Sequence, residues 1–570
     1  MRTRRRIGTG RIEGLKYVVL RSDAVRCSYL RMAKIKFGDP FGLDNRLVDS
    51  IDWDVSISRI LQDVRSDFIY APHLSTIYAK AGTQLSEALK KELLDGTYVP
   101  GNPITLEVPK TYRMRVAVKS KRLGPNYSRP GSILLPKDRL LYQALADQAA
   151  NVVNKKTDKT RSFSHRLGPK TSPTMFLSTR SSWDAMQKAL KEYSHEDDVR
   201  YIIKMDITDY FGSINQHTLI NTLEDDGYPS SLSSRLEALL IGYTGERSSR
   251  SILQGMFPSD LFGSYYLTPI DRFLEELGVR SARYVDDMYV FVGSVDEADK
   301  VVRDLIPRLR GYDLVLSEAK SAIIPKAALL TEEPDLEDLF SAAVDEISDQ
   351  LTEENTHGGY GFQAEWEGDV EDKDEFLQLE ATKVLFDSLG EYPGQEENIE
   401  RFCLPIFSQA SSDYAITHVF EAFDKRSSMT QLYTSYLSNF VEDDDVAEFL
   451  TDQLDDTSLM DWQVMWVLAS LLRRRNATPD GVKRAWVLAK AGLRHDAMRA
   501  VAAIYVGRFG DLDRRKALIA LYPQLSQYMQ CAIYYSSQTW PANERTNARA
   551  MWGAQGELNK LLTLALAAKT

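Results

Sequence analysis

The chain has 570 residues, of which 43% are hydrophobic, with a mean hydropathy of -0.32 and a formal net charge of -11. No apolar run reaches the roughly 18 residues that a bilayer-spanning helix needs, so the composition excludes an integral membrane protein. The three cysteines (Cys27, Cys403 and Cys531) form no CxxC pair, so neither a disulfide framework nor a zinc site is indicated. A chain of this length exceeds one compact core, and its basic N-terminus lacks the apolar segment of a secretory signal. We therefore expect a cytoplasmic protein of several domains.

The charge is distributed unevenly along the chain. Residues 331–380 hold 18 Asp and Glu against the single Lys373, whereas residues 107–170 hold 15 Lys and Arg against four acids. A long basic stretch is typical of a surface that follows a phosphate backbone, with an affinity that falls as salt rises. The alternative is a solvated basic face, which needs no partner.

The patterns divide the chain into four parts. Residues 1–100 are predicted to form a basic arm followed by helices, and 100–330 show the short strand-like runs between helices of an α+β unit. The acidic segment 331–380 is interpreted as a linker or a surface insertion. Residues 381–570 show helical periodicity almost throughout.

A repeated tripeptide stands out in the last part. Ala503-Ile504-Tyr505 returns as Ala532-Ile533-Tyr534, each within a helix-like run. The spacing favours stacked helix pairs of the HEAT kind, and a plain helical bundle is the alternative.

Three acids within the α+β part lie beside strand-like runs. Asp206 ends the apolar run YIIKM, and Asp286 and Asp287 separate two apolar runs at 282–293. Phosphoryl transfer from a nucleotide uses two divalent cations about 4 Å apart, and hard cations prefer carboxylate oxygens brought together from separate strands. The pair alone is also compatible with a polar hairpin tip.

The surroundings of these acids resemble a known family. KMDITDYFGSI (204–214), LQGMFPSDLFGSYYL (253–267), RYVDDMYVFVG (283–293) and LVLSEAKS (314–321) resemble, in order, motifs A to D of reverse transcriptases. Upstream, SRPGSILLPKDRLLYQAL (128–145) and FSHRLG (163–168) resemble the finger segments of these enzymes. The resemblance covers about 100–325 and implies a right-hand polymerase with fingers and palm.

The resemblance implies roles for individual residues. Asp206 and Asp286 would bind two Mg²⁺ ions, with Mn²⁺ as an alternative, Asp287 would support them, and the carbonyl of Ile207 would complete one shell. Phe211 would crowd the sugar 2′ position and favour deoxynucleotides, unless it is a core aromatic. Gln254 and Gly255 would form the loop on which the nucleotide lies, since glycine removes a Cβ there.

Basic residues complete the implied site. Arg129 would pair with the triphosphate, and Lys119 and Lys121 would contact either the triphosphate or the template. Lys320 matches the lysine proposed to donate a proton to pyrophosphate, and an exposed helix-end lysine is the alternative reading.

The layout narrows the resemblance further. No RNase H or zinc-bearing endonuclease pattern is found, and a helical part follows the polymerase segment without an obvious thumb, as in the defence-associated and abortive-infection reverse transcriptases of bacteria. Membership of that group implies deoxynucleoside triphosphates as substrates and RNA or single-stranded DNA, including a non-coding RNA, as partners. It also implies a homo-oligomer (trimer or hexamer). Synthesis in that group uses a template or proceeds without one. The alternatives are a housekeeping, CRISPR-linked or maturase-like enzyme, and a catalytically silent RNA-binding scaffold.

Overall fold

The computed structural model describes residues 41–114, 116, 124–244, 249–332, 343, 370–552 and 556–567. The predictions for the basic arm up to residue 40, for Lys119 and Lys121, and for most of the acidic segment lie outside these residues. The first part of the chain contains α2 (Asn45–Ser50), α3 (Trp53–Asp63), α4 (Pro72–Asp95), β1 (Ile104–Arg113), β2 (Asn126–Ile133), α5 (Pro136–Lys156) and α6 (Thr179–Ser194). It continues with β3 (Tyr201–Met205), α7 (Tyr210–Ser213), α8 (Gln216–Asp225), α9 (Ser230–Thr244), α10 (Phe257–Tyr266), α11 (Thr268–Glu276), β4 (Arg280–Tyr284), β5 (Asp287–Val292), α12 (Val295–Gly311), β6 (Ala322–Pro325) and α13 (Lys326–Glu332).

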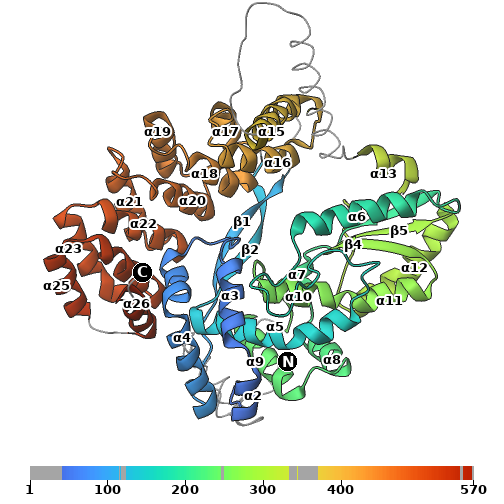
Figure 1. Cartoon of the computed structure of the whole chain (residues 1–570), viewed down its shortest axis with the longest axis horizontal. Coiled ribbons are helices and arrows are strands. Elements are labelled where there is room, and N and C mark those ends of the chain that lie inside the picture. Colours follow the sequence, from blue (N-terminus) through green and yellow to red (C-terminus); the bar gives the residue numbers. More distant parts are fainter. Residues whose placement is uncertain are drawn as a thin grey trace, which may run out of the picture.

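An antiparallel sheet in the order β4-β5-β3-β6 forms the centre of the part predicted as palm (Figure 1). Both of its faces are covered. Ile202 and Phe291 pack with Met186 and Leu190 of α6 on one face, whereas Ile203 and Val290 join the main core on the other, which includes α12. Burial on both faces explains why β3 and β5 read as continuous apolar runs, because alternation appears only when one face is solvated.

A two-stranded hairpin forms the part predicted as fingers. β1 and β2 pair antiparallel, with Val108 opposite Arg129, and a register shift follows between Pro109 and Arg113. Helices α3, α4 and α5 pack together beside the hairpin. Arg139 of α5 fixes this packing, because its guanidinium donates to Asp63 at 2.8 Å and to Asp67 at 2.6 Å.

The rest of the described chain is helical. It contains α15 (Val370–Asp387), η2 (Ser388–Glu391), α16 (Glu396–Gln409), α17 (Ile416–Ala422), η3 (Ser427–Met429), α18 (Thr430–Leu437), α19 (Asp444–Asp452), η4 (Gln453–Asp455) and α20 (Asp461–Leu471). It ends with α21 (Gly481–Lys490), α22 (Asp496–Phe509), α23 (Leu512–Leu521), η5 (Tyr522–Gln524), α24 (Gln527–Ser536), η6 (Ser537–Thr539), α25 (Ala542–Trp552) and α26 (Glu557–Ala567). Among the described residues, no helix combines the length and apolar character needed to cross a membrane.

Alternate helices of this region pack against one another in sequence. α16 contacts α18, α18 contacts α20, α20 contacts α22, and α22 contacts α24, which contacts α26. The two Ala-Ile-Tyr tripeptides fall on the neighbouring helices α22 and α24, where they are buried. α15 begins at Val370, within the segment predicted as a linker or insertion, and the domain boundary at 381 stays a prediction.

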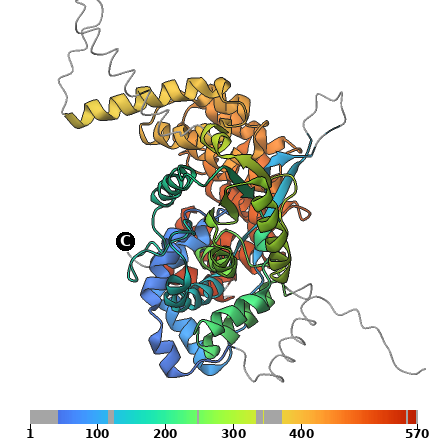
Figure 2. The ribbon, with the colours of Figure 1, turned by 90° about the vertical axis from the view of Figure 1, so that its right-hand side faces the viewer.

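The helical region folds back onto the beginning of the chain. Figure 1 shows it as an arc of gold, orange and red helices whose red end meets the blue α4 near the C-terminus, and in Figure 2 red helices again lie beside blue ones. The indole groups of Trp462 and Trp466 both donate to the carbonyl of Phe68, at 2.7 and 3.2 Å. Lys137 of α5 forms ion pairs with Glu92 of α4 and Glu557 of α26. The helical region and the polymerase-like part therefore share an interface.

His73 lies in this interface, and its burial predicts a dependence of stability on pH. Its ring stands edge-on to Tyr528 of α24 with 4.6 Å between centroids, and burial lowers the pKa of the imidazole to about 3. An unfolded histidine titrates near 6.5. The unfolded chain therefore takes up a proton that the folded chain refuses, so stability present above pH 6.5 is lost as the pH falls from 6.5 towards 3.

We expect His73→Phe, which keeps an aromatic ring at this position but has no group that titrates, not to lose stability in this way as the pH falls. The free energy of unfolding of the parent should fall relative to the variant by up to about 1.4 kcal/mol per pH unit below pH 6.5. Urea titrations of both proteins between pH 7.5 and 5 measure the difference, in which the other titrating groups cancel. If the free energies of unfolding of the two proteins changed in parallel with pH, His73 would bind a proton equally well in the folded and the unfolded chain.

Candidate active site

Three acids meet at one end of the central sheet. Asp206 directly follows β3, Asp286 lies in the turn between β4 and β5, and Asp287 begins β5. Met205 is paired with Met288 and Tyr284 with Asp287, so the register brings the two segments side by side. The tight turn between two strands, predicted from the apolar runs on either side, is confirmed.

The electrostatics of this cluster are those of crowded like charges. Burial, together with the neighbouring charges of Asp287 and Asp206, raises the pKa of Asp286 to about 7. A carboxylate in this position is costly unless positive charge is supplied. The cluster is therefore a place where cations bind favourably.

Lys320 supplies one positive charge. Its ammonium lies 3.1 Å from Asp206 Oδ1 and 5.1 Å from the ring centre of Tyr112, which extends from β1. Burial opposes the charged form of Lys320, but the hydrogen bond and charge of Asp206 outweigh burial and raise its pKa. The segment predicted as motif D thus reaches the acids. A second contact anchors it, because Ser317 N–H donates to the carbonyl of Asp206 at 2.8 Å.

The donor set fits divalent cations, since three carboxylates are the hard oxygen ligands that Mg²⁺ and Mn²⁺ prefer. Over the described ranges, no three His, Cys, Asp or Glu side chains converge closely enough to hold a metal ion as they stand. In the structure Asp206 Oδ1 accepts a hydrogen bond from the ammonium group of Lys320.

The backbone segment after Asp206 pairs with the segment predicted as motif D through an isolated antiparallel bridge, and the carbonyl of Ile207 takes no part in the hydrogen bonds of this bridge. The bridge between Ile207 and Leu316 uses the carbonyl of Asp206 and the N–H of Thr208, which donates to Val315 at 2.9 Å. The side chain of Ile207 is buried. Its role as a metal ligand stays a prediction.

Phe211 lies on α7, five positions after Asp206 in the chain. It is half-buried and packs close to Gly263 of α10, where an added Cβ would lie 3.0 Å from its ring. Its carbonyl accepts from Ile252 N–H at 3.1 Å, which ties motif A to the start of motif B. The position is compatible both with a sugar gate and with an aromatic at the edge of the core.

The backbone conformation and the surroundings of Gly255 both require glycine, and its role in nucleotide binding stays a prediction. Its φ of +98° favours glycine, and a Cβ there would lie 2.6 Å from the ring of Phe68. The space is thus filled by a side chain of the same chain. Gln254, next to it, accepts from Ser132 N–H of β2 at 3.2 Å through its carbonyl. The motif B loop is therefore held between the fingers hairpin and Phe68.

Arg129 stands over the same aromatic ring. Its guanidinium lies 4.8 Å from the centre of Phe68, and burial together with the charge of Arg401 lowers its pKa. Arg401 belongs to α16, so two arginines from distant parts of the chain lie near each other. The structure thus places Arg129 near the helical region, and its role in binding the triphosphate stays a prediction.

Sequence reasoning missed several residues that position the site. Arg283 is buried beside the turn, and Ser164 accepts a hydrogen bond from the turn. Phe68 packs against Gly255, and Tyr112 packs against Lys320. One signal was available, because a charged residue in the otherwise apolar run ARYV must find a buried partner. The other residues act through tertiary contacts that no local pattern reveals.

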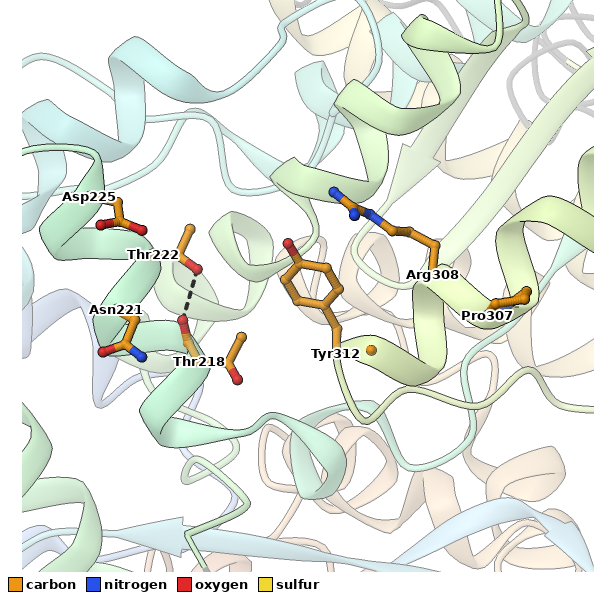
Figure 3. A pocket seen from close by; sticks show the side chains of 8 residues that line it. Thr218, Asn221, Thr222, Asp225, Pro307, Arg308 and Tyr312 are labelled. Atoms are coloured by element: carbon orange, nitrogen blue, oxygen red, sulfur yellow. Dashed lines mark hydrogen bonds between the residues drawn. The ribbon is translucent and has the colours of Figure 1, made fainter.

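A cavity found among the described residues lies away from the acids. A cavity of about 360 Å³ lies between α8 and α12 and is lined by residues that include Asp225, Arg308 and Tyr312. Figure 3 shows the Thr222 hydroxyl bonded to Thr218 at its rim, with Arg308 and Tyr312 opposite. None of the predicted site residues lines it.

Comparisons with known proteins identify the central part of the chain. Residues 118–333 match the model of a family described as reverse transcriptase (RNA-dependent DNA polymerase). No curated protein matches the chain. The chain therefore contains a reverse-transcriptase domain with nucleotidyltransferase chemistry, followed by a largely helical region.

Solved structures that match include three of telomerase, one from Candida albicans and two from Candida tropicalis. The telomerase of Candida albicans, in complex with the TWJ fragment of telomeric RNA, is 10% identical over 61% of this chain, with a TM-score of 0.28. Apo telomerase from Candida tropicalis is 11% identical over 85% of this chain and 73% of its own, and its complex with the TWJ fragment is 11% identical over 86% and 68%, both with a TM-score of 0.28. The match spans 65% of the first of these chains, which is less than two thirds of its length.

Proposed function

We propose that the protein is a DNA polymerase of the reverse-transcriptase type that acts in the antiviral defence of a bacterium. The observation that carries the polymerase proposal is the meeting of Asp206, Asp286 and Asp287 at one end of a sheet within the matched domain. The defence role rests on the layout, in which a helical region follows the polymerase domain, and on its resemblance to the defence-associated group.

The proposed reaction is the addition of a deoxynucleotide to a hydroxyl group, with release of pyrophosphate. Two bound cations would activate the hydroxyl and stabilise the leaving group. Asp206 and Asp286 would hold them, with Asp287 and the carbonyl of Ile207 in support. Lys320 holds a proton beside Asp206 and is the proposed donor to pyrophosphate, because its raised pKa keeps it charged until it acts.

The proposed partners are nucleic acid and deoxynucleoside triphosphates. The template is RNA, single-stranded DNA or a fixed non-coding RNA, unless synthesis proceeds without one. Arg129 supports binding of a phosphate group, since its Nε is buried with no hydrogen-bond partner among the described residues. Arg401 adds positive charge beside it. The helical region is proposed to form repeats that assemble the chain into a trimer or hexamer.

The identity of the product tests the mode of synthesis. Purified protein is incubated with Mg²⁺ and each labelled deoxynucleotide, with and without RNA, and the product is digested with nuclease or with protease and then sequenced. Template-directed synthesis yields the complement of the added RNA. Label that stays on the protein until protease treatment indicates synthesis primed on the chain itself. No label in any product would contradict the polymerase proposal.

We expect Phe211→Ala to relax the choice of sugar. If the ring crowds the 2′ position, its removal should raise kcat/KM for ribonucleotides about 10- to 100-fold relative to deoxynucleotides, which corresponds to a clash of roughly 1–3 kcal/mol. Steady-state incorporation of paired ribo- and deoxynucleotides measures the ratio. Phe257→Ala, at a half-buried phenylalanine on α10 that is not proposed as a gate, is the matched control. A parent that already uses both sugars equally would contradict the assignment.

A further inference from the structure

The turn that carries Asp286 has an unfavourable backbone. We call residues 284–287 the catalytic turn; within it Tyr284 pairs with Asp287, and Val285 and Asp286 form its tip. Val285 has a φ of +56°. A β-branched residue rarely adopts this left-handed conformation, because its Cβ crowds the backbone, and it persists only where neighbouring groups impose it.

Two side chains form hydrogen bonds with the backbone of Val285, one on each side of the residue. Its N–H donates to Ser164 Oγ at 2.7 Å, and its carbonyl accepts from Arg283 Nη1 at 3.2 Å. Ser164 is buried. Its segment runs beside β4, because Arg283 N–H donates to Arg161 at 2.7 Å and Phe163 N–H donates to Arg283 at 3.1 Å. The backbone of Arg283 thus holds the segment that carries Ser164, while the side chain of Arg283 bonds to the carbonyl of Val285.

Arg283 is itself held in one orientation. Its guanidinium donates to both oxygens of Asp271 on α11, at 2.8 to 3.0 Å, and to the carbonyl of Ser264 on α10 at 2.9 Å. Arg283 and Asp271 are both almost fully buried. One planar side chain therefore joins the motif B helix, α11 and the catalytic turn, which a lysine lacks the geometry to do.

We propose that Ser164 and Arg283 are positioning residues that clamp the catalytic turn in its left-handed conformation and so place Asp286 for cation binding. The proposal rests on the proposed polymerase function, but it concerns residues that touch neither nucleotide nor metal ion. The clamp offsets the backbone strain at Val285 and links the position of Asp286 to motif B. A shift of the turn would change the position of Asp286 relative to Asp206, since the turn leads into β5, and β5 pairs with β3, the strand that Asp206 follows.

The test is Ser164→Ala, which removes the acceptor and little volume. We expect kcat to fall about 10- to 100-fold, as for a small misplacement of a reacting group, with the KM for the nucleotide nearly unchanged. We also expect the Kd for Mn²⁺, measured by electron paramagnetic resonance without nucleotide, to rise by about 10-fold or more, as when a group that orients a metal ligand is lost. Ser162→Ala is the matched control, because this buried hydroxyl on the same segment has no hydrogen-bond partner among the described residues.

A second variant tests the strain directly. Val285→Gly adopts a positive φ without the Cβ clash, so the turn then needs no clamp. In this background Ser164→Ala should lower kcat by no more than about twofold, and the two changes should not be additive. An equal loss of kcat in both backgrounds, or unchanged Mn²⁺ binding in Ser164→Ala, would overturn the clamp. Absence of synthesis by the parent would instead count against the polymerase, and the Mn²⁺ titration would still decide the clamp.

Discussion

Replacing Asp286 with asparagine is expected to lower the rate of nucleotide incorporation by more than about 10³-fold, the scale of losing charge stabilisation in a transition state. Asparagine keeps the shape of the side chain and removes the charge that a cation requires. Since the charges of Asp287 and Asp206 raise the pKa of Asp286 on top of burial, removal of one charge should not unfold the protein. Asp206→Asn should cause a loss of the same order, because it removes the other proposed ligand.

Single-turnover incorporation at saturating Mg²⁺ measures this loss, and circular dichroism with thermal unfolding checks the fold. Asp299→Asn is a suitable control, since this acid lies in an exposed pair with Arg303 on α12. A folded Asp286→Asn protein with a rate near that of the parent would exclude the two-metal site at these residues.

Ending the chain after Glu332 is expected to leave a poorly soluble protein with weak or unregulated synthesis and no protective activity. The truncation removes Trp462 and Trp466, which bond to Phe68, and α26, which covers α4. The buried apolar face of α4 would then meet water, and each buried hydrogen bond lost costs about 1 kcal/mol or more. Because Phe68 packs on Gly255, the damage should extend to the motif B loop.

Light scattering and incorporation assays on both chains measure the effect. Full-length protein should have the mass of a trimer or hexamer, and the truncated chain should be a monomer or an aggregate. The double substitution Trp462→Phe and Trp466→Phe in the full-length chain removes both hydrogen-bond donors to the carbonyl of Phe68. It therefore distinguishes the effect of losing this contact from the effect of losing the whole helical region. A strictly monomeric and fully active full-length protein would contradict the assembly role.

Local patterns predict the polymerase fold well because its signals are local. The apolar runs around Asp206 and around Asp286 place both acids at strand ends, and the structure has strands there. The helical periodicity beyond the acidic segment likewise corresponds to helices. The helix α15 was not predicted as far back as Val370, because the acidic composition there suggested a linker or insertion.

The contacts that hold the site together could not be predicted in the same way. Val285 meets Ser164 across 121 residues, and Lys320 meets Asp206 across 114. Such pairs depend on the path of the chain in space, which one sequence does not reveal. The need for glycine at position 255 was predicted, but its cause, the ring of Phe68, belongs to a segment outside every motif.

The most direct measurement is primer extension on an RNA template by the purified full-length protein, with a parallel reaction that contains no template. Two-metal synthesis at Asp206 and Asp286 predicts incorporation of labelled deoxynucleotide in Mg²⁺ or Mn²⁺, in at least one of the two reactions, that stops on addition of a chelator. Folded protein that incorporates no label in either reaction, or that incorporates it equally in the presence of the chelator, would contradict this function.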